Sequence, residues 1–200
     1  MAQLGFTTMS LAEWIATALG IACVALAARR SIWTFPTAIV SVTLLGLVVF
    51  RARLYSDALL QLFFAAANLY GWINWRRAQA QTGDVPVRTL DTRARAAWLV
   101  GIVVCWLAWG SAMHRLTDAA LPWWDAGIAA ASVAAQLLMA RRAIENWWLW
   151  IAVDLASVPL YLTKGLYPFA GLYLVYLALA IWGLIDWRRA LGTRRRMVPA

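Results

Sequence analysis

Long apolar stretches separated by short polar segments run along the whole chain. Seven of them, each bounded by charged or turn-forming residues, are close to the length of about 20 residues that a transmembrane helix needs. They cover residues 10–28, 33–50, 56–75, 96–113, 121–140, 146–163 and 169–187. A membrane barrel has alternating strands of only about ten residues. The pattern therefore predicts an all-α integral membrane protein with seven transmembrane helices.

The composition excludes a water-soluble domain. Hydrophobic residues make up 64% of the 200 positions and charged residues 14%, whereas soluble domains have about 45–50% and about 25%. The first ten residues hold no Lys or Arg, so we expect the opening segment to be a retained helix and not a cleaved signal peptide. A Gly-rich phosphate loop is absent from the sequence, so ATP hydrolysis by this chain is not expected.

The positive charge is distributed unevenly along the chain. Of 18 Lys and Arg residues, 14 fall in the odd-numbered loops and the C-terminal tail. Basic loops remain on the cytoplasmic side, which predicts an external N-terminus and a cytoplasmic C-terminus. The longest polar segment, residues 76–95, holds Gly83, Pro86 and five arginines, and this composition predicts a solvated cytoplasmic linker.

The two halves of the chain resemble each other at an offset of 112 residues. Between residues 29–78 and 141–190, 16 of 50 positions are identical without a gap. Residues 1–78 and 121–200 thus form two three-helix repeats, and residues 79–120 supply the linker and a connecting fourth helix. Because four spans separate equivalent points, both repeats enter the membrane in the same direction, as a parallel 3+1+3 repeat of the SWEET type.

A parallel repeat favours a transporter with its substrate site near the membrane midplane, between the halves. The alternative from another class is a membrane scaffold or accessory subunit, because duplicated bundles also serve as scaffolds. Enzyme chemistry has little support, since His114 is the only histidine and has no metal-ligand companions. Cys23 and Cys105 lie in apolar runs, and we expect them to be small buried hydrophobes. No cofactor or metal site is predicted.

Polar residues within the predicted spans are candidates for the site, because a polar group in a bilayer costs free energy and faces the bundle interior. On the sixth span a spacing of three or four places five such residues on one face. They are Asn146, Trp150, Asp154, Ser157 and Tyr161. Pro159 is expected to kink or break this helix near Asp154.

A second interior face is predicted on the third span, and a third on the fifth. The third span carries Gln61, Phe64, Asn68, Trp72 and Trp75 at helical spacing, and the fifth carries Ser132 and Gln136. Amide groups together with indole faces suit a flat heteroaromatic ring. Several tryptophans near span ends are instead expected to be interfacial belt residues. These are Trp14, Trp33, Trp98, Trp123, Trp124 and Trp187.

At these residues the chain resembles the Pnu family of bacterial vitamin transporters, whose best-known members carry nicotinamide riboside. The matching stretches run from Asn68 to Trp75, from Ser132 to Gln136, from Glu145 through Asp154 and Tyr161 to Tyr167, and from Gly183 to Trp187. The resemblance implies a SWEET-like fold in the bacterial inner membrane, a homotrimer, and passive facilitated diffusion. It also implies that a cytoplasmic kinase traps the imported vitamin as an early step of NAD biosynthesis.

The resemblance assigns substrate contacts by position. It implies that Gln136, Asn146, Trp147 and Trp150 contact the vitamin, and that Asn68 and Trp72 contribute from the third span. Asp154 and Tyr161 are assigned to the same site. Nicotinamide riboside and thiamine each carry a fixed positive charge on a flat ring, and the family also includes riboflavin carriers. Thiamine and riboflavin therefore remain alternatives to nicotinamide riboside.

Overall fold

A computed structural model describes residues 11–51, 55–117 and 121–197 of the chain. Within these ranges the chain forms seven α-helices and no named β-strand. The helices are α1 (Leu11–Ala28), α2 (Thr34–Arg51), α3 (Tyr55–Thr82), α4 (Thr92–Leu116), α5 (Pro122–Ala140), α6 (Glu145–Thr163) and α7 (Tyr167–Met197). The seven predicted spans are confirmed. Helices α3 and α7 continue well past the end of their apolar stretches, to Thr82 and Met197. Hydropathy marks where a span ends and does not mark where the helix ends.

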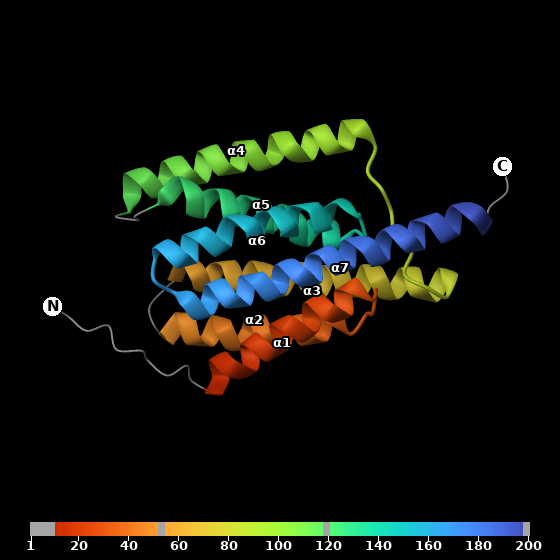
Figure 1. Cartoon of the computed structure of the whole chain (residues 1–200), viewed down its shortest axis with the longest axis horizontal. Helices are drawn as coiled ribbons and strands as arrows, with labels where there is room; N and C mark the ends of the chain where they lie inside the picture. The colour runs from red at the N-terminus through yellow and green to blue at the C-terminus, as the bar shows by residue number, and fades with distance from the viewer. Residues whose placement is uncertain (1–10, 52–54, 118–120, 198–200) are drawn as a thin grey trace.

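The helices form two three-helix bundles joined along their sides, with α4 on the outside (Figure 1). In the first bundle α2 packs against α1 and α3, and in the second α6 packs against α5 and α7. The bundles meet where α1 packs against α7 and α3 packs against α5. These two junctions are equivalent under the 112-residue offset, so the repeat found in the sequence is also a repeat in space.

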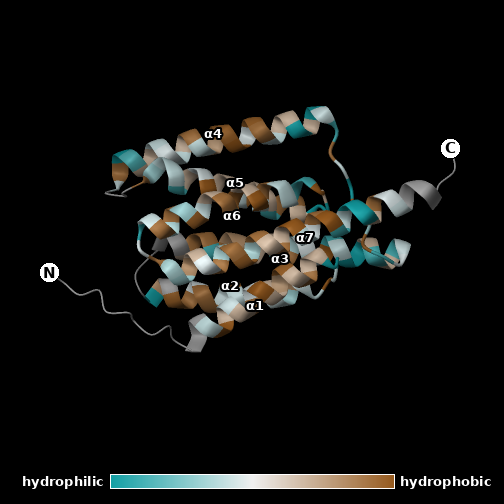
Figure 2. Cartoon of the chain, viewed as in Figure 1, coloured by the Kyte–Doolittle hydropathy of each residue, from teal (hydrophilic) through white to brown (hydrophobic). Residues whose placement is uncertain are grey.

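The outer surface of the bundle is strongly apolar. Two of the described segments are each long and apolar enough to cross a membrane, namely α4 and residues 167–193 of α7. Among the described helices α4 packs only against α5, and most of its large apolar side chains are exposed. Cys105 on α4 is therefore exposed, contrary to prediction, and Cys23 on α1 is half-buried. Polar residues gather at the end of the bundle where α3 ends and α4 begins (Figure 2).

Helices α1 and α5 end in the same unusual turn. Arg30 and Arg142, which lie 112 residues apart, both have left-handed backbone, with φ of 57° and 63°. In each turn the arginine N–H donates to the carbonyl three residues before it, and the next N–H donates to the carbonyl five residues before it. This is the Schellman arrangement, usually made by glycine. Left-handed backbone costs other residues about 1–2 kcal/mol, and both repeats carry this strain.

The segment between α3 and α4 is shorter and more buried than the solvated linker expected for residues 76–95. It comprises only residues 83–91, and in it Val85 and Val87 are buried in the core. Arg88 N–H donates to the Arg142 carbonyl, and Ile144 N–H donates to the Arg88 carbonyl, each at 2.9 Å. The two alternating valines give this polar segment one apolar side, which anchors it to the turn between α5 and α6.

Helix α6 is continuous through Pro159 and is not broken near Asp154. Pro159 lies one turn from the C-terminal end of the helix and is exposed. Proline removes a single hydrogen-bond donor, the N–H that would reach the carbonyl of residue 155. The rest of the helix keeps its geometry, because packing against α5 and α7 supports it on two sides.

Glycine on α7 should be required where it faces Trp147 and dispensable where it faces outward. A Cβ atom at Gly183 would lie 2.5 Å from atoms of the Trp147 ring, whereas nothing lies within 4 Å of one at Gly171. Overpacking costs about 1–3 kcal/mol, and each kcal/mol lowers Tm by about 2–4 °C in a protein of this size. We therefore expect Gly183→Ala to lower the Tm of the detergent-purified protein, and Gly171→Ala to leave it unchanged or higher. Equal Tm values would contradict this packing.

Candidate functional site

Four aromatic rings lie at the junction of the two repeats. Phe35 on α2 meets Trp75 on α3 edge to face, with ring centroids 5.0 Å apart and an interplanar angle of 87°. Trp147 on α6 and Trp187 on α7 repeat this pair at 5.6 Å and 87°. Trp75 and Trp187 then meet each other at 5.8 Å. All four side chains are almost fully buried, so this aromatic cluster closes the bundle at the end that carries the arginine turns.

Two reciprocal hydrogen bonds hold the aromatic cluster between the repeats. The Trp75 indole N–H donates to the carbonyl of Met139 at the end of α5, and the Trp187 indole N–H donates to the carbonyl of Ala27 at the end of α1. Both bonds are 3.1 Å long, and both donors and acceptors are related by the 112-residue offset. The prediction of Trp187 as an interfacial belt residue is therefore wrong, because its indole ring is buried in the core and its N–H bonds to a backbone carbonyl.

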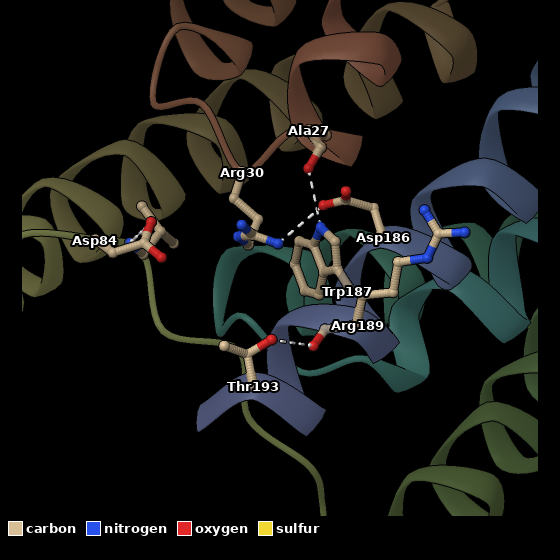
Figure 3. Close-up of polar contacts among 8 residues, drawn as sticks. Ala27, Arg30, Asp84, Asp186, Trp187, Arg189 and Thr193 are labelled. Carbon is tan, nitrogen blue, oxygen red and sulfur yellow. Dashed lines mark hydrogen bonds and ion pairs between the residues drawn. The ribbon is translucent and has the colours of Figure 1, made fainter. Parts of the chain in front are cut away.

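The position before each of these tryptophans makes a different contact in each repeat. The Asn74 side-chain amide donates to the Ala140 carbonyl at 2.7 Å. The equivalent residue, Asp186, accepts from the Arg30 guanidinium at 2.8 Å, so that an ion pair joins α1 to α7 beside the Trp187 bond (Figure 3). The two junctions are thus equal in their indole bonds and unequal in charge.

Two of the predicted site residues, one from each repeat, meet in the interior. The Gln136 amide on α5 donates to the Asn68 side-chain oxygen on α3 at 3.0 Å. The Asn68 amide donates to the Phe64 carbonyl at 2.8 Å. Both side chains are buried. This amide pair therefore joins the two repeats by a side-chain hydrogen bond at the α3–α5 junction.

The interior face predicted on α6 is present, and tyrosines from α7 complete it. Asp154 and Ser157 are buried, and the Ser157 hydroxyl has no hydrogen-bond partner among the described residues. Tyr161 stacks on Tyr173, with centroids 5.2 Å apart and planes 23° from parallel. The α6 face therefore holds a buried carboxyl group and a buried hydroxyl, and the Tyr161 ring links this face to Tyr173 on α7.

Tyr173 and Tyr176 are two further candidates for the site, which the sequence analysis did not predict. Tyr176 meets Tyr173 edge to face at 5.9 Å, and its hydroxyl lies 2.6 Å from the position of a Cβ atom at Gly20 on α1. A glycine on α1 therefore makes room for this hydroxyl at the α1–α7 junction. The signal in the sequence is the spacing of three between the tyrosines on an otherwise aliphatic span.

The other predicted site residues lie nearer to the aromatic cluster. Asn146 is fully buried, and its amide donates to the Ala143 carbonyl at 2.6 Å while its side-chain oxygen has no partner among the described residues. Trp147 belongs to the aromatic cluster itself. Trp150 and Trp72 are half-buried and pack against the same core. The predicted residues thus fall into three groups along the interior: the amide pair, the Asp154 face, and the edge of the aromatic cluster.

The described residues offer no metal centre. Within residues 11–51, 55–117 and 121–197, no three His, Cys, Asp or Glu side chains converge on one point. His114 at the end of α4 is exposed, and its ring lies 6.4 Å from that of Trp123. The interior instead offers amides, phenols, indoles and one carboxylate, a set that binds a planar organic molecule by stacking and hydrogen bonding.

Comparisons with known proteins agree on one family. The family profile described as nicotinamide mononucleotide transporter matches residues 10–189. The nicotinamide riboside transporter PnuC of Escherichia coli strain K12 is 29% identical over 204 residues, which cover 90% of this chain and 85% of the relative. The riboflavin/roseoflavin transporter RibM of Streptomyces davaonensis is 36% identical over 185 residues, covering 88% and 83%.

A solved structure matches the same fold. The crystal structure of the vitamin B3 transporter PnuC superposes with a TM-score of 0.77 at 26% sequence identity, and covers 94% of this chain and 85% of that chain. The seven-helix, 3+1+3 SWEET-like architecture expected from the internal repeat is thereby confirmed. These relatives are transporters by name, and none is an enzyme.

A double-mutant cycle should reveal the amide pair. Replacing either Asn68 or Gln136 by leucine leaves the other amide without its partner, so each single change should lower the free energy of unfolding. The double variant should be more stable than the sum of the single changes predicts, by about 0.6–1.7 kcal/mol, as for hydrogen bonds between membrane helices. A cycle between Gln136 and Asn146, which do not contact each other through any hydrogen bond of the described residues, is the control. A coupling no larger than that of the control would contradict the pair.

Proposed function

The chain belongs to the family of nicotinamide mononucleotide transporters, and on that basis we propose that it carries nicotinamide riboside across the membrane by facilitated diffusion between its two repeats. The chain is a multi-pass membrane protein of a vitamin-transporting family.

The observation that carries the choice of vitamin is the buried Asp154. No cationic side chain of the described residues forms an ion pair with it. A carboxylate within a membrane span is costly unless a partner or a pathway compensates for it. A substrate with a fixed positive charge on a flat ring provides that partner while it passes. The stacked rings of Tyr161 and Tyr173 add faces that attract a cation.

The remaining candidates have complementary roles in this proposal. The amide pair, Asn68 and Gln136, offers a donor and acceptors to a carboxamide group or to ribose hydroxyls. Asn146 contributes its free side-chain oxygen, and Trp72, Trp147 and Trp150 contribute indole faces. Because Trp147 is sealed in the aromatic cluster, it contacts substrate only after the cluster has opened. The cluster is then the barrier on one side of the site.

Riboflavin is the second candidate, and the 36% identity to a riboflavin/roseoflavin transporter favours it. Its ring system is uncharged, so it would use the stacking surfaces and the amide pair without needing the carboxylate. Thiamine carries a fixed charge, as nicotinamide riboside does. A charged and an uncharged vitamin should therefore differ in how strongly their transport depends on Asp154.

The transport cycle needs no energy input from this chain in our proposal. A cytoplasmic kinase phosphorylates the vitamin and so keeps its internal concentration low. The excess of basic residues in the odd-numbered loops and the C-terminal tail supports a cytoplasmic C-terminus and an external N-terminus. We also propose the division into two repeats, 1–78 and 121–200, with the connecting unit 79–120, and assembly as a homotrimer.

Uptake into proteoliposomes tests the choice of vitamin. Purified protein should equilibrate labelled nicotinamide riboside, and Asp154→Asn should slow this uptake about tenfold, the effect of about 1.4 kcal/mol. Asp125→Asn is the matched control, because Asp125 is a half-exposed residue paired with Lys164 and such surface pairs contribute little. Faster entry of riboflavin than of nicotinamide riboside, with no effect of Asp154→Asn, would favour the second candidate. Absence of vitamin-specific uptake would instead favour the scaffold, and inhibition by an uncoupler would exclude simple facilitation.

The Arg30–Asp186 pair should hold the barrier closed. Asp186→Asn replaces the charged contact with the residue type found at the equivalent position 74, and it should weaken the α1–α7 junction. Because both side chains are partly exposed, the pair contributes at most about 1 kcal/mol. We expect hydrogen exchange of the backbone in residues 26–34 to become up to about fivefold faster, with no change for Asp125→Asn. Unchanged exchange in Asp186→Asn would show that the indole bonds alone keep the barrier closed.

A further inference from the structure

A cavity of about 470 Å³ opens at the basic end of the bundle, outside the proposed pathway. It lies between the segment before α4, the first turns of α4 and α6, and the polar part of α7. Its walls are Thr89, Arg95, Ile144, Glu145, Trp148, Arg188 and Leu191. None of the residues assigned to vitamin binding lines it. Its volume is within the usual range of small-molecule sites, about 300–1,000 Å³.

One side of the cavity is a carboxylate with one satisfied and one free oxygen. Glu145 Oε1 accepts from the Leu90 N–H at 3.1 Å and from Arg95, whose Nη2 lies 2.8 Å away. The second oxygen, Oε2, is buried and has no hydrogen-bond partner among the described residues. Arg95 compensates the charge of Glu145, and Oε2 can accept from the hydroxyl group of a ligand once the Glu145 side chain turns toward the cavity.

The other side of the cavity carries a cation without an anionic partner. The Arg188 guanidinium lies over the Trp148 ring, 5.0 Å from its centroid, and forms no ion pair with a carboxylate of the described residues. With two arginines and one glutamate, the lining has a net charge of +1. A singly charged anion therefore matches it, and a planar guanidinium binds phosphate oxygens in pairs.

Four arginine–tryptophan contacts lie near the ends of the apolar stretches of the helices, and the Arg188–Trp148 contact of the cavity is one of them. Arg29 and Arg141, which are equivalent in the two repeats, lie over Trp182 and Trp98. Arg76, the equivalent of Arg188, lies over Trp72. Tryptophan and arginine concentrate where lipid headgroups meet the hydrocarbon core. Of these four arginines, only Arg188 also lines the cavity.

We propose that this cavity binds a singly charged phosphate ester that carries a hydroxyl group, the chemistry of an anionic phospholipid headgroup such as that of phosphatidylglycerol. The phosphate contacts Arg188, a hydroxyl donates to Glu145 Oε2 after a turn of the Glu145 side chain toward the cavity, and Ile144, Trp148 and Leu191 cover the apolar part of the ligand. A free phosphate ester with hydroxyl groups has the same recognition chemistry. Either ligand would bridge α6 and α7 next to the barrier.

Native mass spectrometry of the full-length protein released from detergent tests this site. The wild type should retain phosphatidylglycerol in preference to phosphatidylcholine, which has no hydroxyl donor in its headgroup. Arg188→Gln should weaken this binding about tenfold, because it removes a charge-assisted contact at the headgroup level. Arg189→Gln is the matched control: it removes the same charge from the next, exposed residue of α7, which does not line the cavity. It should change binding less than about twofold.

Two further measurements separate the sources of the ligand and guard against misfolding. Glycerophosphoglycerol, the singly charged phosphodiester headgroup without acyl chains, should compete only if a free phosphate ester is the ligand. Arg188→Lys keeps the charge, and therefore the stability of the fold, but loses the paired geometry, so it should bind between wild type and Arg188→Gln. Equal losses in Arg188→Gln and Arg189→Gln, or no lipid preference in the wild type, would overturn the proposal. None of these readouts depends on which vitamin is transported.

Discussion

The two indole–carbonyl bonds between the repeats are the constraint on which the rest of the fold depends. Inside a bilayer a buried indole N–H needs an acceptor within the protein. Trp75 and Trp187 each find one at the last turn of a helix in the other repeat. In the left-handed turns that end α1 and α5, the same two carbonyls also accept the N–H groups of Arg30 and Arg142, so each oxygen uses both of its lone pairs. The strained turns, the tryptophans and the α1–α7 and α3–α5 junctions therefore form one arrangement, made twice.

Much of the fold could be predicted from the sequence, because the bilayer and the duplication both leave strong periodic signals. The seven spans followed from hydropathy, and the 112-residue offset predicted which helices are equivalent. Residues whose environment depends on tertiary contacts were harder. Trp187 was expected at the interface because it lies at a span end, yet its partner is a carbonyl 160 residues away in the chain. The burial of Val85 and Val87 could not be predicted from composition, because the segment that contains them is polar as a whole.

The candidate site shows the same division. Helical spacing placed Asn68, Gln136 and Asp154 each on an interior stripe of its own helix. Spacing alone gave no reason to connect Asn68 with Gln136, or Tyr161 with Tyr173, because those contacts depend on how the helices pack. Trp147 was assigned to the site by family resemblance alone, and its burial against Trp187 depends on the packing of α6 against α7.

The reciprocal bonds also bear on how the two repeats diverged after duplication. Their acceptors are backbone carbonyls, at Ala27 in one repeat and Met139 in the other. Any side chain that the turn tolerates presents the same oxygen, so mutation could alter these positions freely. The donors had no such freedom, because an indole N–H has no isosteric replacement among the other amino acids. The residue that supplies the carbonyl could therefore change, whereas the tryptophan that supplies the N–H could not. The two repeats could in this way acquire different surfaces and charges while keeping the same backbone arrangement.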